Sequence, residues 1–524
     1  MVDRFRKLPE SSFDVIVVGA GLGGLTSAGV LAKRGYRVLV LDQHYVAGGC
    51  ATVFKRRGYE FDVGLHYIGE CQPGGAVHRM LSAAGADAVE FEELDPDGYD
   101  TIMFPDRVFR FPKGLDSLQS RLLEHFPDER AGIERYVRLL REFERIPRLL
   151  SDPRALLGTL PGSLATVRWA LGSFGSFLDS CTRNPQLKGV LAAQNGDYGL
   201  PPSRASTLMG AGLTLHYSHG AFFPRGGGQR ISDELATAIE RNGGRIVLRA
   251  RVERIVVSQG RVHGVQITSK HLGTRTLTAP VVISNADLKR TMFELVGRDH
   301  LRRWTSRRVE RFEMAPALGV AYVGLKRDLR AEGFARSNYW ILPRYDFEAD
   351  YSALRDGRWI DPLPVCVTIA SLKDPTNPRL APPGITNVQV MSIAPSEPER
   401  WGVTEEAVRS GAYSDLETYQ HAKEAYGDRL LASAERLLPG IRSQIAYREI
   451  ATPLTLRRYT GATAGTSYGI ASTPGQFHAL RPGAKTEIHG LYLAGASGRT
   501  GPGIVGAMAS GMMAAREVRK AGGR

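Results

Sequence analysis

A strand, glycine turn, helix and second strand near the N-terminus constrain the fold of this chain more than any other feature. Residues 13–18 form an apolar, β-branched run, and residues 19–24 follow as GAGLGG. A helical pattern then leads to a second apolar run, residues 36–41, which ends on Asp42. This order of elements, closed by an acid, predicts a Rossmann-like α/β domain that binds a dinucleotide.

Each part of this pattern has a physical role in holding a dinucleotide. Gly19 permits the tight turn after the strand, Gly21 lets the backbone approach a pyrophosphate, and Gly24 lets the helix pack closely on the sheet. The helix N-terminus offers free N–H groups and the positive end of its dipole to phosphates. Asp42 lies where a carboxylate accepts hydrogen bonds from the adenosine ribose, which argues against a 2′-phosphate. The predicted contacts in this stretch are Gly19, Gly21, Leu22, Gly23, Gly24 and Asp42.

Composition excludes several other classes of protein. The net charge of +14 is spread along the 524 residues without a polybasic tail, so no nucleic-acid partner is predicted. The four cysteines form no C-x-x-C pair, which argues against a disulfide framework or a zinc site and fits a reducing compartment. We expect no metal and a cytoplasmic protein, attached at most to a membrane surface. The apolar stretch at residues 13–32 is explained by the dinucleotide motif rather than by a targeting segment.

A second glycine pair carries a resemblance to a known family. Gly48 and Gly49 are followed by Thr52, by YEFDVG at residues 59–64 and by LHYIG at residues 65–69. This arrangement resembles FAD-dependent oxidoreductases of the amine oxidase and phytoene desaturase type, and its HYIG continuation is most similar to the retinol saturase and carotenoid isomerase branch. In that group the glycine pair passes close to the flavin side of the pyrophosphate. The usual acid there is Glu, one methylene longer than Asp42, but the glycine pair favours FAD over NAD.

Later segments extend the resemblance to the middle and the end of the chain. Residues 222–227 read FFPRGG, residues 280–287 read PVVISNAD, and residues 452–469 resemble a segment of carotenoid desaturases. Near the C-terminus, a strand ending at Gly495 precedes a Gly/Pro turn and a helix that begins near Ile504. A helix N-terminus aimed at the flavin stabilises the negative charge that develops on reduction. The further predicted FAD contacts are Gly48, Gly49, Thr52, Val252, Gly495, Gly503 and Ile504.

The resemblance implies a discontinuous domain organisation. We expect a glutathione-reductase-type FAD domain, a discontinuous α+β substrate domain and a helical lobe. The FAD domain comprises residues 11–95, 221–295 and 480–520. The substrate domain comprises residues 96–220 and 296–479, with residues 115–200 as a lobe that contacts a membrane.

Local patterns predict several individual elements. Residues 75–220 are mainly helical in pattern, and a helix is expected to start near Ser232 with that residue as its N-cap. Residues 245–255 and 261–268 alternate and predict a hairpin, whereas residues 314–325 predict a buried strand.

The leucine-rich stretch at residues 146–178 allows two interpretations. Prolines break it into short apolar pieces with basic flanks, which is typical of helices in a membrane interface. The alternative is an ordinary buried helical lobe. The hydrophobic substrate class implied by the resemblance favours the membrane.

The resemblance also implies a chemistry. Members act on long polyenes or isoprenoids by hydride transfer at flavin N5, in desaturation, saturation or isomerisation, with NAD(P) or a quinone as candidate electron partner. His66 and Tyr67 are the candidate catalytic residues, and a histidine could exchange protons near neutral pH. Tyr217 and His219 are weaker candidates, and the acidic pair Glu92 and Glu93 is expected to lie in a solvated loop.

Three alternatives remain open from the sequence. A serine hydrolase is suggested by GTSYG at residues 465–469, but no apolar strand precedes it. A flavin amine oxidase would need an aromatic cage and often a covalent flavin cysteine, and neither has a motif here. A prenyl-binding chaperone of the GDP-dissociation-inhibitor type shares the fold, but the intact glycine motifs argue against it.

Overall fold

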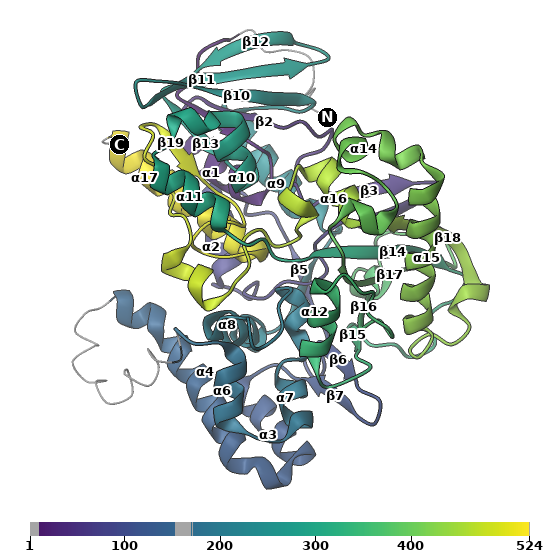
Figure 1. The fold of residues 1–524 in the computed structure, drawn as a ribbon. Helices are drawn as coiled ribbons and strands as arrows, with labels where there is room; N and C mark the ends of the chain where they lie inside the picture. Colours follow the sequence, from purple (N-terminus) through teal and green to yellow (C-terminus); the bar gives the residue numbers. More distant parts are fainter. Residues whose placement is uncertain (1–9, 152–168, 170, 523–524) are drawn as a thin grey trace.

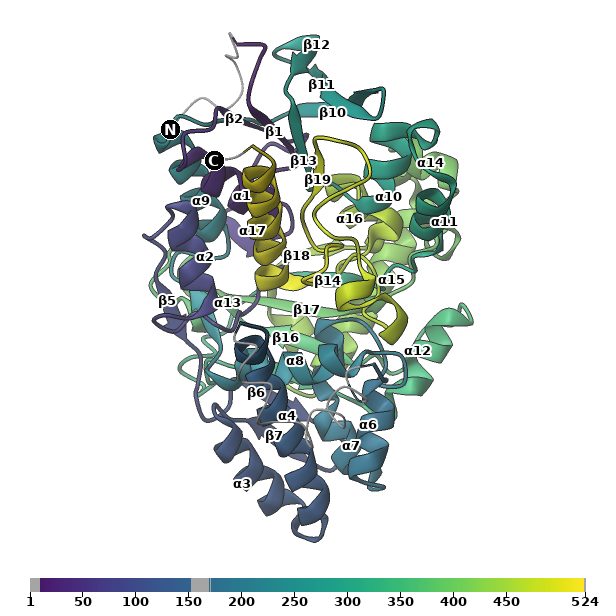
Figure 2. The same cartoon turned by 90° about the vertical axis from the view of Figure 1, so that its left-hand side faces the viewer.

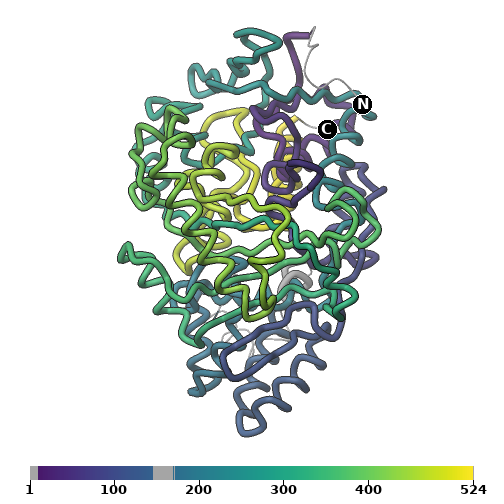
Figure 3. Tube along the Cα trace, turned by 90° about the vertical axis from the view of Figure 1, so that its right-hand side faces the viewer, coloured from purple at the N-terminus to yellow at the C-terminus, as the bar shows by residue number. Residues whose placement is uncertain are grey.

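A computed structural model describes residues 10–151, 169 and 171–522 of the chain. In Figure 1 a small antiparallel sheet lies at the top, a parallel sheet lies beneath it, a large mixed sheet crosses the middle and a group of helices forms the lower end. The termini lie near each other, so the yellow C-terminal helix runs beside the purple N-terminal segment (Figure 3).

The parallel sheet confirms the α/β prediction. Its strand order is β19-β13-β1-β2-β9, and every neighbouring pair is parallel. Parallel strands need crossover connections and are covered on both faces. The strands are β1 (Val15–Val18), β2 (Val38–Leu41), β9 (Arg245–Val247), β13 (Val281–Ser284) and β19 (Leu491–Leu493).

Alternation along β1 divides the core into two layers. Val15 and Val17 pack towards the helices, whereas Ile16 and Val18 pack towards the small antiparallel sheet. The helical layer contains α1 (Leu22–Ala32), α2 (Ala76–Ala84), α9 (Gln229–Arg241) and α17 (Gly503–Gly522). The other layer contains β10 (Ala250–Ser258), β11 (Arg261–Ser269) and β12 (Gly273–Thr278).

The large sheet has the strand order β18-β14-β17-β16-β15-β6-β7 and is antiparallel except for the pair β15 and β6. One face packs against α15 (Glu417–Ala434), and the opposite face carries Val320, Trp340 and Met391. The buried strand expected within residues 314–325 is confirmed as β14 (Ala317–Leu325). The other strands are β6 (Asp100–Met103), β7 (Val108–Phe111), β15 (Asn338–Ile341), β16 (Val365–Thr368), β17 (Thr386–Ala394) and β18 (Ile445–Ala451).

A helical lobe lies at the end of the molecule away from the parallel sheet (Figure 2). It contains α3 (Leu115–His125), α4 (Arg130–Ser151), α6 (Phe174–Cys181), α7 (Pro185–Leu191) and α8 (Thr207–Ser218). Within the described residues, every helix is too short or too polar to cross a membrane. The described part of residues 75–220 is mainly helical, as expected, but it also contains the strands β5 (Phe91–Glu93), β6 and β7. β5 and β6 pair with strands distant in sequence, whereas β7 pairs with β6.

The leucine-rich stretch at residues 146–178 is only partly described, because residues 152–168 and 170 lie outside the described residues. At its C-terminal end Leu171 is 72% exposed. Phe174, Phe177 and Leu178 are buried. This described end therefore packs into the lobe.

Two local predictions are wrong for identifiable reasons. α9 begins at Gln229 rather than near Ser232, and the Ser232 hydroxyl donates to Ala51 O at 2.8 Å from inside the helix. Residues 245–255 do not form one strand, because Arg249 adopts a left-handed conformation (φ 53°) and divides them between two sheets. The hairpin itself forms between β10 and β11.

Candidate functional site

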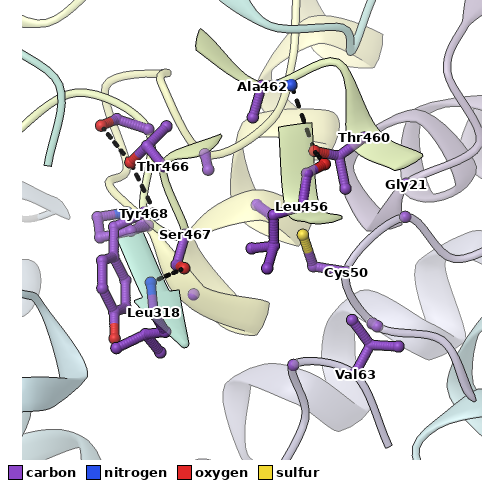
Figure 4. Close-up of a pocket in the computed structure, with 18 of the residues that line it drawn as sticks. Gly21, Cys50, Val63, Leu318, Leu456, Thr460, Ala462, Thr466, Ser467 and Tyr468 are labelled. Atoms are coloured by element: carbon purple, nitrogen blue, oxygen red, sulfur yellow. Dashed lines mark hydrogen bonds between the residues drawn. The ribbon is translucent and has the colours of Figure 1, made fainter. Parts of the chain in front are cut away.

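One cavity of about 860 Å³ connects the parallel sheet with the large sheet. Val18 and Leu41 line it at the carboxyl ends of β1 and β2, which is where open α/β sheets bind ligands. Figure 4 shows Gly21, Cys50 and Val63 on one side of this space and Leu318 and Tyr468 on the other. The lining of the cavity is therefore drawn from both sheets and from the segments beside them.

The glycine turn after β1 is packed so tightly that side chains cannot be added. Gly19 has a positive φ of 96°, and its N–H donates to Leu41 O at 2.8 Å. A Cβ on Gly24 would lie 2.1 Å from Gly19 O, so the predicted close approach of helix and strand is present. Gly48 has a φ of 133° and donates to Ala20 O at 2.8 Å, which places the second glycine pair against the first turn.

Asn285, directly after β13, was missed as a site residue. A Cβ on Gly21 would lie 2.7 Å from its Nδ2, and one on Gly23 would lie 2.6 Å from its Oδ1. A Cβ on Gly495 would lie 2.9 Å from the same Oδ1. These glycines therefore make room for an amide side chain as well as for a ligand. The signal in the sequence was the polar residue that ends an apolar strand at the ligand-binding edge of the sheet.

Asp42 ends β2 and accepts two backbone hydrogen bonds. Its carboxylate accepts from Ala20 N–H at 2.7 Å and from His44 N–H at 2.8 Å. Burial raises the pKa of Asp42, although the two hydrogen bonds oppose this shift. The acid thus ties the glycine turn to the end of β2 and lines the cavity beside it.

Thr52 and Val252 line the cavity from two other elements. The Thr52 hydroxyl donates to Gln229 Oε1 at 2.7 Å, so its proton is used at the start of α9. Val252 lies on β10 and is buried, and it presents an apolar surface to the cavity. The Thr52 hydroxyl proton therefore already has a partner within the protein, whereas the Val252 side chain can contact an apolar group in the cavity.

The C-terminal loop after β19 forms the other part of a glycine cradle, which also contains the turn after β1 and the pair Gly48 and Gly49. Gly495 has a φ of 101°, and the helix that follows begins at Gly503, with Ile504 lining the cavity in its first turn. Arg481, which sequence reasoning missed, is buried beneath this loop and donates to Ala496 O at 2.8 Å and to Gly498 O at 3.4 Å. Burial lowers the pKa of Arg481 to about 10.

These residues fit a flavin dinucleotide. The N-termini of α1 and α17 both border the cavity, and neither carries an acid in its first turn that would repel phosphate or reduced flavin. Backbone N–H groups and glycines form the wall, so it is shaped for close contact with a pyrophosphate.

His66 lines the cavity, but its environment does not suit a proton donor. Burial, followed by the charge of Lys373, lowers the pKa of His66 to about 3, so the imidazole is neutral at ordinary pH. Its Nδ1 is buried without a hydrogen-bond partner among the described residues. The idea that His66 exchanges protons near neutral pH is therefore corrected: it offers a neutral ring.

Tyr67 belongs to a buried polar cluster in the cavity wall. Its hydroxyl lies 2.6 Å from Asp197 Oδ2 and 3.0 Å from Asp100 Oδ2. Its ring stacks on Tyr217, with the ring centroids 4.4 Å apart. Lys373 also belongs to the cluster, and its Nζ donates to His66 O at 2.6 Å and to the side chains of Asn338 and Thr368.

This cluster contains further buried polar residues that sequence reasoning did not single out. Asp100, Asp197 and Lys373 come from β6, from the short helical segment Ala193–Asp197 and from the segment after β16, respectively. Burial raises the pKa of both Asp100 and Asp197 and lowers the pKa of Lys373 to about 8. No local sequence pattern indicates these residues, because they come together only in the folded protein.

The weaker candidates divide between the cluster and the surface. Tyr217 lines the cavity as the stacking partner of Tyr67, whereas the His219 side chain is 49% exposed and its ring nitrogens lie 3.6 Å from Glu70 and Glu144. The acidic pair is not a solvated loop. Glu92 and Glu93 lie on β5, where Glu92 pairs with Arg225 and Arg336 and Glu93 pairs with Lys113.

The GTSYG segment does not form a hydrolase elbow. A helix, α16 (Pro453–Thr460), precedes it instead of a strand, and the Ser467 hydroxyl accepts from Leu318 N–H at 3.2 Å (Figure 4). Tyr468 donates to Gly196 O at 2.5 Å, next to Asp197. The segment thus supports the polar cluster.

The parallel sheet, the double-glycine cradle and the cavity behind it define a flavin-dependent oxidoreductase. In agreement, residues 22–519 match the family described as flavin containing amine oxidoreductase, and the chain belongs to that family. Its cofactor is FAD.

Curated relatives span most of the chain. It is 29% identical to all-trans-retinol 13,14-reductase of Danio rerio, over 93% of this chain and 83% of the relative. The human all-trans-retinol 13,14-reductase is also 29% identical, over 98% of this chain and 86% of the relative. Prolycopene isomerase 1, chloroplastic, of an Oncidium hybrid cultivar is 26% identical, over 97% and 84%.

Solved structures share the fold. An oxidoreductase from Methanosarcina mazei superposes with a TM-score of 0.64 at 19% identity, covering 95% of this chain and 98% of that one. Putrescine oxidase bound to putrescine gives 0.62 at 14% identity, covering 98% and 100%. A Rab GDI from Plasmodium falciparum gives 0.53 at 11% identity, covering 96% and 97%. At these identities the likeness concerns the fold alone.

Proposed function

We propose that this chain adds hydrogen across a C=C bond of a hydrophobic polyene or isoprenoid. The observation that carries the proposal is that the FAD cradle opens directly into an apolar chamber within the same cavity. The names of the relatives, which are reductases of retinol and isomerases of prolycopene, support the same substrate class. The chamber is lined by side chains from α8 and the large sheet, among them Leu208, Met209, Leu213, Leu318, Val320, Leu342, Val365, Met391 and Ile393.

The chain's own residues supply binding and the exclusion of water. When bound, FAD supplies two-electron hydride chemistry at N5. The aliphatic side chains of the chamber bind an extended hydrocarbon through burial of apolar surface. Trp340 and Tyr351 add flat aromatic surfaces that suit a conjugated chain, and the neutral ring of His66 lines the same cavity. A two-electron donor of the nicotinamide or quinol class would complete the cycle.

The alternatives predict different chemistry. A flavin amine oxidase would be reduced by amines, and a prenyl-binding chaperone would carry no flavin. The apolar chamber and the retinol and prolycopene enzymes among the relatives support polyene chemistry over both.

A spectroscopic experiment tests the proposal. The purified protein should show oxidised flavin bands, which dithionite bleaches under anaerobic conditions. Addition of all-trans-retinol or a linear carotene should restore the bands, and the product should gain two hydrogens by mass spectrometry. Bleaching of the oxidised enzyme by putrescine would support the amine oxidase instead, and a protein without flavin would support the chaperone. Isomerised substrate of unchanged mass would contradict saturation but not the substrate class.

We further propose that the protein takes its substrate from an anionic membrane surface. The helix α11 (Arg303–Arg311) carries Trp304, which is 57% exposed, and the neighbouring Leu480 is 47% exposed. Among the described residues, Arg303, Arg307 and Arg311 have no carboxylate within ion-pair distance. Exposed aromatic and basic side chains on one helix suit a membrane interface.

Vesicle sedimentation tests this surface. The protein should sediment with phosphatidylglycerol vesicles more than with phosphatidylcholine vesicles, and Arg307→Glu/Arg311→Glu should abolish the difference. The same change of charge at the end of α12 (Phe347–Arg355) and just after it, Arg355→Glu/Arg358→Glu, is the control. Equal loss in both variants would contradict a role for α11.

A further inference from the structure

The hydrogen bonds of Tyr67 require a proton that the tyrosine cannot supply. Its hydroxyl oxygen lies 2.6 Å from Asp197 Oδ2 and 3.0 Å from Asp100 Oδ2, so both contacts are within hydrogen-bond distance. A tyrosine has one O–H, and an ionised carboxylate only accepts hydrogen bonds. If Tyr67 donates to one carboxylate, the other contact must be donated by a protonated carboxyl group. One of the two aspartates is therefore a neutral acid.

The surroundings of the two aspartates show which one is neutral. Asp100 also accepts from Gln194 Nε2 at 2.5 Å and from Asn338 Nδ2 at 3.2 Å, so three donors surround it when Tyr67 points towards it. Hydrogen bonds of this kind stabilise the ionised form. Asp197 has no other hydrogen-bond partner than Tyr67 among the described residues. The proton therefore belongs to Asp197, which donates to Tyr67, and Tyr67 in turn donates to Asp100.

The segment that carries Asp197 is held in place against the cavity. Tyr351 donates to Asn195 Oδ1 at 2.9 Å, and Tyr468 donates to Gly196 O at 2.5 Å. Asp197 and Tyr67 line the cavity, whereas Asp100 is fully buried and does not. Asp197 is thus the member of the pair that a bound substrate can reach.

We propose that Asp197 is the catalytic acid of this enzyme and that Tyr67 and Asp100 are the positioning residues that keep it protonated. This assignment rests on the proposed function, the saturation of a C=C bond. It replaces His66 as the proton donor.

The proposed step adds a hydride and a proton to the two carbons of the C=C bond. One carbon of the C=C bond receives a hydride from the reduced flavin, and the neighbouring carbon uses the π electron pair to take the proton of Asp197. Two C–H bonds form, the Asp197 O–H bond breaks, the flavin is left oxidised and Asp197 is left as a carboxylate. A nicotinamide or quinol donor returns two electrons to the flavin, and solvent water returns the proton to Asp197.

The charged groups around Asp197 are consistent with a neutral acid. Burial and the Asp100 carboxylate raise the pKa of Asp197 to about 8, and the Tyr67 hydrogen bond and Lys373 oppose the shift. Lys373 is the cation of the cluster and has its own pKa lowered to about 8 by burial. The other titratable groups that face Asp197 are Tyr67, Tyr99, Tyr198, Tyr217, Tyr468 and Cys366, whose pKa values burial raises, so they are neutral near pH 7.

A single-turnover experiment tests the chemical role. Dithionite-reduced holoenzyme is mixed anaerobically with a polyene that reoxidises the wild type, with all-trans-retinol as the first probe. Asp197→Asn should bind flavin normally but reoxidise it at least about 100-fold more slowly, the usual contribution of a general acid. Asp106→Asn is the matched control, because Asp106 also accepts from a tyrosine, Tyr345, at 2.7 Å and lies outside the cavity.

An infrared measurement tests the proton without any reaction. The substrate-free protein should show the carbonyl band of a protonated carboxylic acid, and this band should vanish in Asp197→Asn and persist in Asp106→Asn. Tyr67→Phe, which removes the hydrogen-bond partner, should shift the band and slow reoxidation, while Tyr345→Phe should do neither. If Asp197→Asn does not fold, this tyrosine pair carries the test.

The outcomes separate the two proposals. Failure of every polyene to reoxidise the wild-type flavin overturns the proposed function. A wild type that reacts while Asp197→Asn reacts equally fast overturns the assignment of Asp197 alone, as does a carbonyl band that persists in that variant.

Discussion

The glycine cradle and the buried polar cluster lie on two walls of one cavity, but backbone groups form the first wall and side chains form the second. The cradle is backbone: Gly19, Gly24 and Gly48 leave room, and the N-termini of α1 and α17 border the cavity. The cluster is side chains: Tyr67, Asp100 and Asp197 meet through hydroxyl and carboxyl groups from separate segments. The cradle fits the FAD cofactor, whereas the cluster is the part of the wall that we propose to act on the substrate.

The two walls should respond differently to substitution. A backbone wall tolerates no added atom, because the neighbouring backbone cannot move away. A side-chain wall tolerates isosteric replacement but loses its chemistry when one proton is removed. Substitutions in the two walls should therefore separate binding of the cofactor from turnover.

The largest effect is expected at Gly24. In Gly24→Ala the new Cβ would lie 2.1 Å from Gly19 O, so the turn must shift, at a cost of about 3 kcal/mol in the free energy of unfolding. The protein should purify without flavin, as measured by its visible spectrum. Gly475→Ala is the control, because nothing lies within 4 Å of its Cβ, and it should keep the flavin. Flavin retained in Gly24→Ala would break the distinction between the two walls.

A smaller effect is expected at Arg481, which donates hydrogen bonds to the C-terminal loop of the cradle. Arg481→Ala leaves buried carbonyl groups of the loop at residues 496–498 without a donor, which costs about 2 kcal/mol. Denaturant unfolding should show this loss, and flavin affinity should fall with it. The exposed Arg308, which donates to Leu480 O, is the comparison, and Arg308→Ala should change neither quantity. Unchanged flavin affinity in Arg481→Ala would show that the loop holds its shape without the arginine.

The smallest effect, counted per pH unit, is expected in the pH dependence of stability. The pKa of Asp197 is about 8 in the folded protein and 3.8 when unperturbed, so between these values the folded state keeps a proton that the unfolded state releases. The free energy of unfolding therefore falls as pH rises through this window, by up to about 1.4 kcal/mol per pH unit from this group. In Asp197→Asn this decline should be shallower.

The control for the pH measurement is Asp106→Asn. The hydrogen bond from Tyr345 lowers the pKa of Asp106, so its contribution changes only below about pH 4 and the slope between pH 4 and 8 should match that of the wild type. An Asp197→Asn slope equal to that of the wild type would assign the shared proton to Asp100.

The two walls also differ in how far the sequence predicted them. Gly19, Gly21, Leu22, Gly23, Asp42, Gly48, Gly49, Gly495, Gly503 and Ile504 were all named from the sequence, and all line the cavity. Gly24, also named, packs the helix on the strand behind it. The residues of the first turn and Asp42 were predictable because this turn demands glycines and an acid at fixed spacing. Gly48, Gly49, Gly495, Gly503 and Ile504 were predicted from the family resemblance. His66 also lines the cavity, and its lowered pKa could not be predicted because burial is not visible in the sequence.

Local turns and strand patterns in the sequence predicted the α/β fold, because they encode backbone geometry, and the resemblance to a flavoprotein family implied FAD and the class of chemistry. Tertiary structure alone decided that Tyr67 meets Asp100 and Asp197, since these residues lie on different elements and touch only after both sheets are packed. It also decided which groups are neutral, because a pKa depends on the burial and the charges that folding creates. Turn geometry can be predicted from residue spacing, whereas contacts between distant residues and their pKa values depend on the folded structure.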